Sequence, residues 1–382
     1  MKLVWATVTQ LSQSKDTYEH SLSKVYECSC LLDEGPAAAA IVYRDLVGDV
    51  REGDRVLLNT TAVELSLGTG GKHFVVARCA AGEAPQGVAL DAPSAHGGHI
   101  MKLRYTPLQR DVLSVESQES PWHKTMERAH DLDHIPVVCC GLHSQVPLVA
   151  AAIKARAPHL RVGYVMSDEA ALSLDLSQVV SQCKAEGLID VTVATGQAFG
   201  GDFEAVNLHS GMLAACHVGG CDVLIVAIGP GVVGSATPFG HGGVAQGEAI
   251  NAVGVLGGLP IACLRMSFAD ERERHRALSH HTVAALDTIA LTKALIALPY
   301  LEDDEQREAF EKKLNTLENR CGHEAIQFEE SVYDEAALRG IKVTTMRRGF
   351  DQDPAFFEAA FAAGALAAQV ASESTTHVSC KG

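Results

Sequence analysis

The sequence predicts an α/β protein in which a Rossmann-like, mostly parallel sheet with helices on both faces follows a smaller β-rich N-terminal domain. From residue 135 onward, short apolar runs alternate with stretches of helical period, which is typical of parallel strands joined by crossover helices. Residues 1–115 instead contain short strand-like runs between Gly-Asp turns, which predict a small barrel or sandwich. A chain of 382 residues also exceeds one ordinary core, so two domains are expected.

The expected strands of the α/β domain are apolar throughout, as they are when helices cover both faces of a sheet. They lie at 136–140, 161–166, 190–195, 222–228 and 260–265. The polar segment 116–134 is predicted to be a linker, and 135–350 to be the α/β domain. Residues 351–382 are predicted to form a C-terminal helix, which begins near Pro354, and a frayed tail.

The composition excludes several classes of protein. A net charge of −16 disfavours a nucleic-acid partner, whose phosphates need a basic face. No apolar run reaches the roughly 18 residues of a membrane span, and the N-terminus turns polar before a signal-peptide core could form. The eleven cysteines include no Cys-x-x-Cys pair, which favours reduced thiols. A cytoplasmic protein without a membrane partner is therefore expected.

The run 229–243 reads GPGVVGSATPFGHGG and directly follows an expected strand. Gly229, Gly231 and Gly234 have the G-x-G-x-x-G spacing that lets backbone N–H groups approach a phosphate or carboxylate. Pro238 delays the next helix, and no acidic residue ends a strand about 20 residues later, so no dinucleotide is expected and the cofactor is left open. Further polar contacts would come from Ser235, Thr237 and His241. The alternative is a glycine-rich turn needed only for packing.

The run 267–282 follows the next expected strand, within RMSFADERERHRALSHHT. If this segment is helical, Arg272 and Arg276 lie on one face and would neutralise a bound anion. Either of the adjacent histidines, oriented by Asp270, would act as general acid or base; these are His280 and His281. The alternative is a solvated helix with ordinary surface pairs four residues apart.

Three further residues are candidates for contacts to the same anion, because ligands of α/β sheets lie beyond the carboxyl ends of the strands. Lys102, on an expected strand, would add positive charge, and His143 and Gln197 occupy loops after strands. No metal site is expected. The HGGH motif at 96–99 lacks further ligands for a tetrahedral set, and the histidines of the predicted linker are expected to be solvated.

Several longer motifs carry a resemblance that covers nearly the whole chain. They are HIMKLRYTPLQ, GPGVVGSATPFGHGGVAQGEAINA, RMSFADERERHRALSHHT and TTMRRGFDQDPAFFEAAFAAGALAA. In these motifs the chain resembles an uncharacterised bacterial family, a domain of unknown function found mainly in Gram-positive lineages. The resemblance implies that the two loops, the strand 99–107 and Thr345–Arg347 form one recurring constellation. It implies no activity or substrate.

The expected function is that of a cytosolic enzyme that binds a small anionic metabolite in the crevice between 229–243 and 267–282. Group transfer, hydrolysis and isomerisation all fit His-based acid–base chemistry, and the β-rich domain would serve as a lid or a homodimer surface. Two alternatives remain open at this point. One is a non-catalytic protein that senses a nucleotide or another metabolite, and the other is a structural or assembly protein without a ligand.

Overall fold

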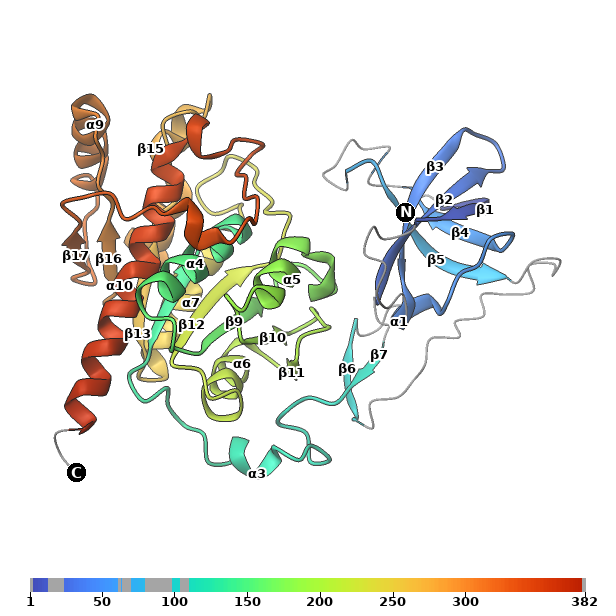
Figure 1. Ribbon diagram of the computed structural model, residues 1–382, viewed down its shortest axis with the longest axis horizontal. Helices are drawn as coiled ribbons and strands as arrows, with labels where there is room; N and C mark the ends of the chain where they lie inside the picture. The colour runs from blue at the N-terminus through green and yellow to red at the C-terminus, as the bar shows by residue number, and fades with distance from the viewer. Residues whose placement is uncertain are drawn as a thin grey trace. The chain divides into compact units, whose positions relative to one another are not determined.

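The computed structural model describes residues 3–12, 24–60, 63, 70–79, 98–103 and 110–379. These residues belong to two compact units (Figure 1). The barrel unit lies within 1–96 and 103–111, and the α/β unit lies within 97–102 and 112–382. The boundary therefore falls before residue 116, so the segment 116–134 belongs to the α/β unit and differs from the predicted linker. Ala129 and Leu132 of this segment are buried in the core of that unit.

The barrel unit is a closed barrel of five strands in the order β1-β2-β3-β5-β4. Alternation of buried and half-buried residues, complete along β5, points every second side chain to the interior. The strands are β1 (Leu3–Leu11), β2 (Val25–Leu32), β3 (Ala37–Tyr43), β4 (Arg55–Asn59) and β5 (His73–Cys79), with α1 (Arg44–Val47) after β3. The β-rich N-terminal region is thus confirmed, as a barrel.

The α/β unit contains a sheet of eight strands, all parallel, in the order β11-β10-β9-β12-β8-β13-β16-β17. All five apolar runs are strands of this sheet, and every residue of β8, β9, β10 and β12 is buried. The bounds are β8 (Pro136–Cys140), β9 (Val162–Ser167), β10 (Val191–Thr195), β11 (Phe203–Ala205), β12 (Val223–Ile228), β13 (Leu259–Cys263), β16 (Leu295–Leu298) and β17 (Glu324–Gln327). The α/β class is confirmed.

Helices cover both faces of the sheet (Figure 1). On β8, Val138 and Cys140 face one core while Val137 and Cys139 face the other. The first core contains α4 (Val146–Arg156), α5 (Gln178–Ala185) and α10 (Pro354–Ser379). The second contains α6 (Leu208–Leu213), the π-helical turns Ala214–Val218 and Ala284–Ile289, and α7 (Val244–Val255). The helix α9 (Asp304–Leu314) adds Phe310 to the second core.

Helix α10 packs closely along α4. A Cβ on Gly364 would lie 2.4 Å from the Val149 carbonyl oxygen, so only glycine permits this approach. The segment Pro354–Glu373 is long and apolar enough to cross a membrane, which the sequence analysis did not anticipate, yet 83% of its most apolar window is buried inside the protein. It is a core helix of the α/β unit.

Short elements complete the fold. They are β6 (Ile100–Lys102), β7 (Arg110–Val112), α3 (His123–Met126), β14 (Met266–Ser267), β15 (Ala277–Leu278) and α8 (His280–Val283). The condition that would place Arg272 and Arg276 on one helical face is not met, since β14 and β15 form an antiparallel hairpin with a single 3₁₀ turn at Glu273–His275. Local hydrogen bonds explain the difference, because Ser267 Oγ accepts from the Asp270 amide and Asp270 Oδ1 from the Arg272 amide.

Candidate functional site

The loops after β12 and β13 meet at the carboxyl edge of the sheet. Strand β12 lies between β9 and β8, and β13 lies on the other side of β8. The chain leaves β9 toward β10 but leaves β12 toward β13, so the connections diverge between these neighbouring strands. Ligands of open α/β sheets bind at such a point. The loop 229–243 follows β12, and the hairpin segment 264–282 follows β13.

Four imidazoles bring these two segments together, and we call them the imidazole cluster: His241, His275, His280 and His281. The His241 ring stacks on the His281 ring with 3.9 Å between centroids and 6° between planes. His280 lies 4.5 Å from His281, and His275 lies 4.9 Å from His280. A Cβ on Gly243 would stand 2.6 Å from His281 Cβ, so a glycine is required where the loop passes over the cluster.

Hydrogen bonds hold three of the four rings, those of His241, His275 and His281. Ser279 caps the first turn of α8, and its hydroxyl lies 2.8 Å from His275 Nδ1. The His241 Nε2–H donates to the Pro238 carbonyl at 3.0 Å, which leaves Nδ1 as the unprotonated nitrogen. His241 Nδ1 and His280 Nε2 are both buried and have no hydrogen-bond partner among the described residues.

Burial keeps the imidazole cluster neutral near pH 7. Burial, followed by the charge of Arg265, lowers the pKa of His275 to about 3 and that of His281 to about 2. Burial and the neighbouring His241 lower the pKa of His280 to about 4, and burial also lowers that of His241. The cluster therefore offers neutral imidazole nitrogens rather than positive charge.

Arg265 is the residue that the sequence analysis missed. It is 6% exposed, and its Nη1 donates to the neutral His281 at Nδ1 over 2.9 Å. No carboxylate oxygen of the described residues lies within 4.0 Å of its guanidinium. Burial and the charge of Arg272 lower its pKa to about 10, so it remains a cation. Arg265 is the last residue of the expected strand 260–265, which is otherwise apolar, so nothing in the sequence singles it out.

Asp270 does not take the expected place beside His280 or His281. Arg272 binds its carboxylate with two hydrogen bonds of 2.9 and 2.8 Å, and Arg348 lies 3.7 Å away. These hydrogen bonds from Arg272 hold the pKa of Asp270 well below its usual range. Asp270 and Arg272 thus neutralise each other, and Arg265 contacts His281 instead. Arg276 is exposed on the hairpin and has no ion pair among the described residues.

Lys102 and Gln197 lie near the other end of the sheet. The Lys102 ammonium is buried and contacts the Ala194 and Ala198 carbonyls and the Glu204 carboxylate. Lys102 was expected to balance charge at the glycine loop, and the structure places it elsewhere. Gln197 follows β10, is half-buried, and its backbone N–H donates to Asp168 at 2.5 Å.

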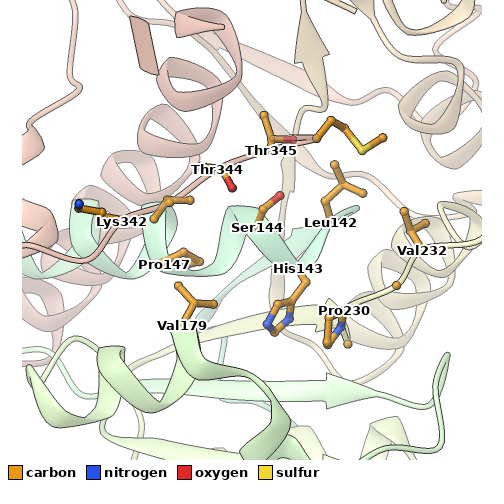
Figure 2. Close-up of a pocket in the computed structure, with 14 residues that line it drawn as sticks. Leu142, His143, Ser144, Pro147, Val179, Pro230, Val232, Lys342, Thr344 and Thr345 are labelled. Atoms are coloured by element: carbon orange, nitrogen blue, oxygen red, sulfur yellow. The ribbon is translucent and has the colours of Figure 1, made fainter. Parts of the chain in front are cut away.

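A cavity of about 330 Å³ lies beside the first part of the glycine loop (Figure 2). Gly229 and Gly231 line it together with His143 and Ser144, which belong to the 3₁₀ turn before α4. Burial lowers the pKa of His143 to about 4. Its Nε2 accepts from Ser177 at 2.6 Å. The other lining residues are Leu142, Pro147, Val179, Pro230, Val232 and 342–346.

The turn 345–348 connects the cavity to the hairpin. Thr345 and Arg348 exchange backbone hydrogen bonds of 2.9 and 2.8 Å, and Met346 and Arg347 between them have φ of 48° and 67°. This is the backbone of a type I′ turn, which glycine and asparagine usually supply. Met346 lines the cavity, while Arg348 donates to Asp353 at 3.0 Å and approaches Asp270.

The tip of the glycine loop is turned onto itself. Ser235 Oγ donates to the Gly240 carbonyl at 2.9 Å, and Thr237 Oγ1 accepts from the Gly240 amide at 3.0 Å. Gly234 passes beside the imidazole cluster, because a Cβ there would stand 3.8 Å from His281 Nε2. Only the two ends of the run 229–243 therefore reach the cavity and the cluster.

Metal binding at the imidazole cluster is disfavoured by its charge. Ligand atoms of His241, His280 and His281 lie within 4.8 Å of one another. Arg265 already occupies His281 Nδ1, however, and its positive charge opposes a cation. The ten described cysteines are free, and none of them belongs to this cluster. His96 of the HGGH motif lies outside the described residues, and His99 Nδ1 lies 2.9 Å from Glu119.

Comparison with known proteins identifies a family without an activity. Residues 39–364 match the family described as "Protein of unknown function (DUF3866)", and the chain belongs to that family. No curated protein and no solved structure matches the chain.

Proposed function

Starting from a family without an assigned activity, we propose that this protein is an enzyme that binds a small anionic metabolite between the glycine loop and the hairpin. The anion, a phosphate or carboxylate, contacts Arg265, and the imidazole cluster exchanges protons with the bound metabolite. In this proposal the α/β unit is a Rossmann-like ligand-binding domain of a bacterial, cytoplasmic protein. The free thiols and the resemblance to a bacterial family support the compartment and the source.

The buried charge of Arg265 carries the proposal. Buried charges in proteins are paired, because an isolated buried ion loses its hydration without compensation. Arg265 is buried, yet its side-chain hydrogen bond among the described residues goes to a neutral imidazole, and the nearby Asp270 is already bound by Arg272. A phosphate or carboxylate would supply the missing negative charge through paired hydrogen bonds.

The unpartnered ring nitrogens support acid–base chemistry. His241 holds its proton on Nε2 and leaves Nδ1 buried with a lone pair, and His280 Nε2 is likewise without a partner. A bound anion raises the pKa of neighbouring imidazoles, because it stabilises their cationic form. The cluster therefore becomes a better proton acceptor when the anion is present, and His241 Nδ1, which carries a free lone pair, is the proposed acceptor.

The cavity supports a metabolite larger than the anion alone. It shares the glycine loop with the imidazole cluster, and Val232 of its wall would lie 3.2 Å from a Cβ on Gly242, next to His241. Its lining combines apolar side chains with the hydroxyls of Ser144 and Thr345, a mixture that suits small organic ligands. We assign the uncharged part of the metabolite to this cavity.

The test is a thermal-shift screen of inorganic phosphate, sugar phosphates, nucleotides and carboxylic acids, followed by calorimetry of each hit. A ligand at 100 times its Kd stabilises the protein by about 2.7 kcal/mol. Arg265→Met is expected to weaken binding at least 100-fold, whereas Arg276→Met, which removes an exposed arginine of the same hairpin, leaves it unchanged. Equal binding by wild type and Arg265→Met would show that Arg265 does not hold the anion.

Turnover separates an enzyme from a sensor. Once a ligand is found, His241→Gln and His280→Gln are expected to abolish its conversion while calorimetric binding survives within about tenfold. His217→Gln, at the opposite edge of the sheet, is the control. A ligand that binds without being converted by wild type would instead support the sensor alternative.

A further inference from the structure

A second set of ligand-capable side chains lies at the amino edge of the parallel sheet. The turn 132–135 precedes β8, and the π-helical turn Ala214–Val218 precedes β12. Because β8 and β12 are parallel neighbours, the segments that precede them meet at the same edge. Asp133, Cys216 and His217 place a carboxylate oxygen, a thiol and an imidazole nitrogen within 4.8 Å of one another.

The backbone on both sides departs from regular structure. The Ile135 amide donates to the Leu132 carbonyl at 2.9 Å, and Asp133 and His134 between them have φ of 48° and 60°. This is a type I′ turn without glycine. The π-helical turn opposite it places Cys216 and His217 next to each other beside the carboxylate.

The imidazole of His217 has a ring nitrogen that can bind a cation. The His217 ring donates from Nε2 to the Asp131 carbonyl at 2.7 Å, so its proton is on Nε2 and Nδ1 carries the lone pair. Histidines that bind metals are oriented in the same way, by a hydrogen bond from the other ring nitrogen to a carbonyl or carboxylate. This bond is an observation separate from the convergence of the three side chains.

The surrounding charge also favours a cation. The charged groups that act on the Cys216 thiol are Asp133, Asp131 and Asp222, and all three are negative. A thiolate, an imidazole and a carboxylate are together the donors that zinc prefers, whereas magnesium and calcium take oxygen ligands.

We propose that Asp133, Cys216 and His217 bind a divalent transition-metal ion of the zinc class, with water as the fourth ligand. Each of the three side chains displaces water bound to the hydrated ion, and the Cys216 proton leaves to solvent. The ion joins the turn before β8 to the helical segment before β12. This inference does not rest on the proposed function, because the site lies at the opposite edge of the sheet.

The test uses the full chain, freed of metal with a chelator and titrated with Co²⁺. Wild type is expected to bind Co²⁺ with visible d–d absorption and a thiolate-to-cobalt charge-transfer band, both of which Zn²⁺ displaces. Cys216→Ser is expected to lose the charge-transfer band. Cys321→Ser is the matched control, because Cys321 is another half-buried free thiol and the neighbouring His323 has both ring nitrogens in hydrogen bonds.

Asp133→Asn tests the site without the risk of misfolding. Asparagine tolerates the left-handed backbone of this exposed turn, so the variant is expected to fold and to bind Co²⁺ at least tenfold more weakly. Absence of Co²⁺ binding by wild type would overturn the proposal, as would a charge-transfer band that persists in Cys216→Ser. A third outcome would also overturn the proposal. If wild type shows Co²⁺ d–d absorption without a thiolate band, and if that absorption is lost in His280→Ala, the ion lies in the imidazole cluster.

Discussion

The two edges of the parallel sheet each gather histidines, but the charges around them are opposite. At the carboxyl edge the imidazole cluster is buried against Arg265, and the nearby carboxylate of Asp270 is held by Arg272. At the amino edge His217 lies among aspartates and beside a thiol. Comparing them shows that imidazoles alone do not determine a ligand. The neighbouring charges decide whether a group of imidazoles favours an anion or a cation.

Arg265→Met is expected to have the largest effect, because it removes the positive charge that distinguishes the carboxyl edge from the amino edge. The variant is expected to lose anion binding and to gain Co²⁺ binding at the imidazole cluster, without a thiolate band, since His281 Nδ1 becomes available. Without ligand it should be no less stable than wild type in urea, because it lacks an unpaired buried guanidinium. If Arg265→Met binds Co²⁺ with the same stoichiometry and spectrum as wild type, the charge of Arg265 does not determine which ligand the imidazole cluster binds.

Acid should lower the stability of the folded protein through His143, which lies at the carboxyl edge of the sheet. Its pKa of about 4 in the folded protein lies below the roughly 6.5 of an unfolded chain, so the unfolded state takes up the proton first. The contribution of His143 to stability is therefore full above about pH 6.5 and falls toward pH 4, by about 2 kcal/mol at pH 5. Urea unfolding at pH 7.5 and 5 is expected to show this loss in wild type and a smaller one in His143→Gln. Equal losses in both proteins would contradict the assignment.

The close approach of the glycine loop to the imidazole cluster predicts a local clash. Gly243→Ala places a methyl group 2.6 Å from His281 Cβ and should destabilise the protein by about 1–3 kcal/mol. Gly349→Ala is the control, since a Cβ there meets nothing within 4 Å. Urea unfolding measures both variants, and similar free energies of unfolding would show that the loop moves away freely.

The smallest effect is expected at the amino edge. Asp131→Asn keeps an oxygen that can accept from the Asp133 amide, at present 3.1 Å away, but removes one negative charge. Co²⁺ affinity should fall a few-fold, because charge at this distance acts through a largely solvated medium. Titration at low and high salt checks this, and the difference between variant and wild type should shrink as salt rises.

The sequence predicted those features that depend on local pattern. The apolar runs became strands of the parallel sheet, and the two loops after β12 and β13 do meet, through His241, His280 and His281. The segment 266–278 forms a hairpin, so the placing of Arg272 and Arg276 on one face, which required a helix, does not hold. Its charges recur four residues apart, but Ser267 and Asp270 satisfy the backbone locally, and Ala277 has a φ of 55°.

The missed residues depend on tertiary placement. Arg265 stands at the end of an apolar run, and only burial without a carboxylate partner reveals its importance. Lys102 was expected at the glycine loop, but strand order puts its acceptors, Ala194 and Ala198, near the far end of the sheet. Asp133 and Cys216 are distant in sequence, and no spacing motif could have joined them.

The packing of α10 on α4 has a consequence for synthesis of the chain. Helix α4 follows the first strand of the parallel sheet, whereas α10 is the last helix in chain order, and the two meet through Gly364 and Val149 (Figure 1). The part of this face that α10 covers therefore stays exposed until the ribosome has made α10, although α4 and α5 already lie on the same face. The α/β unit must complete its folding late, with exposed apolar surface in the meantime, and is the part of the nascent chain that a chaperone would most readily bind.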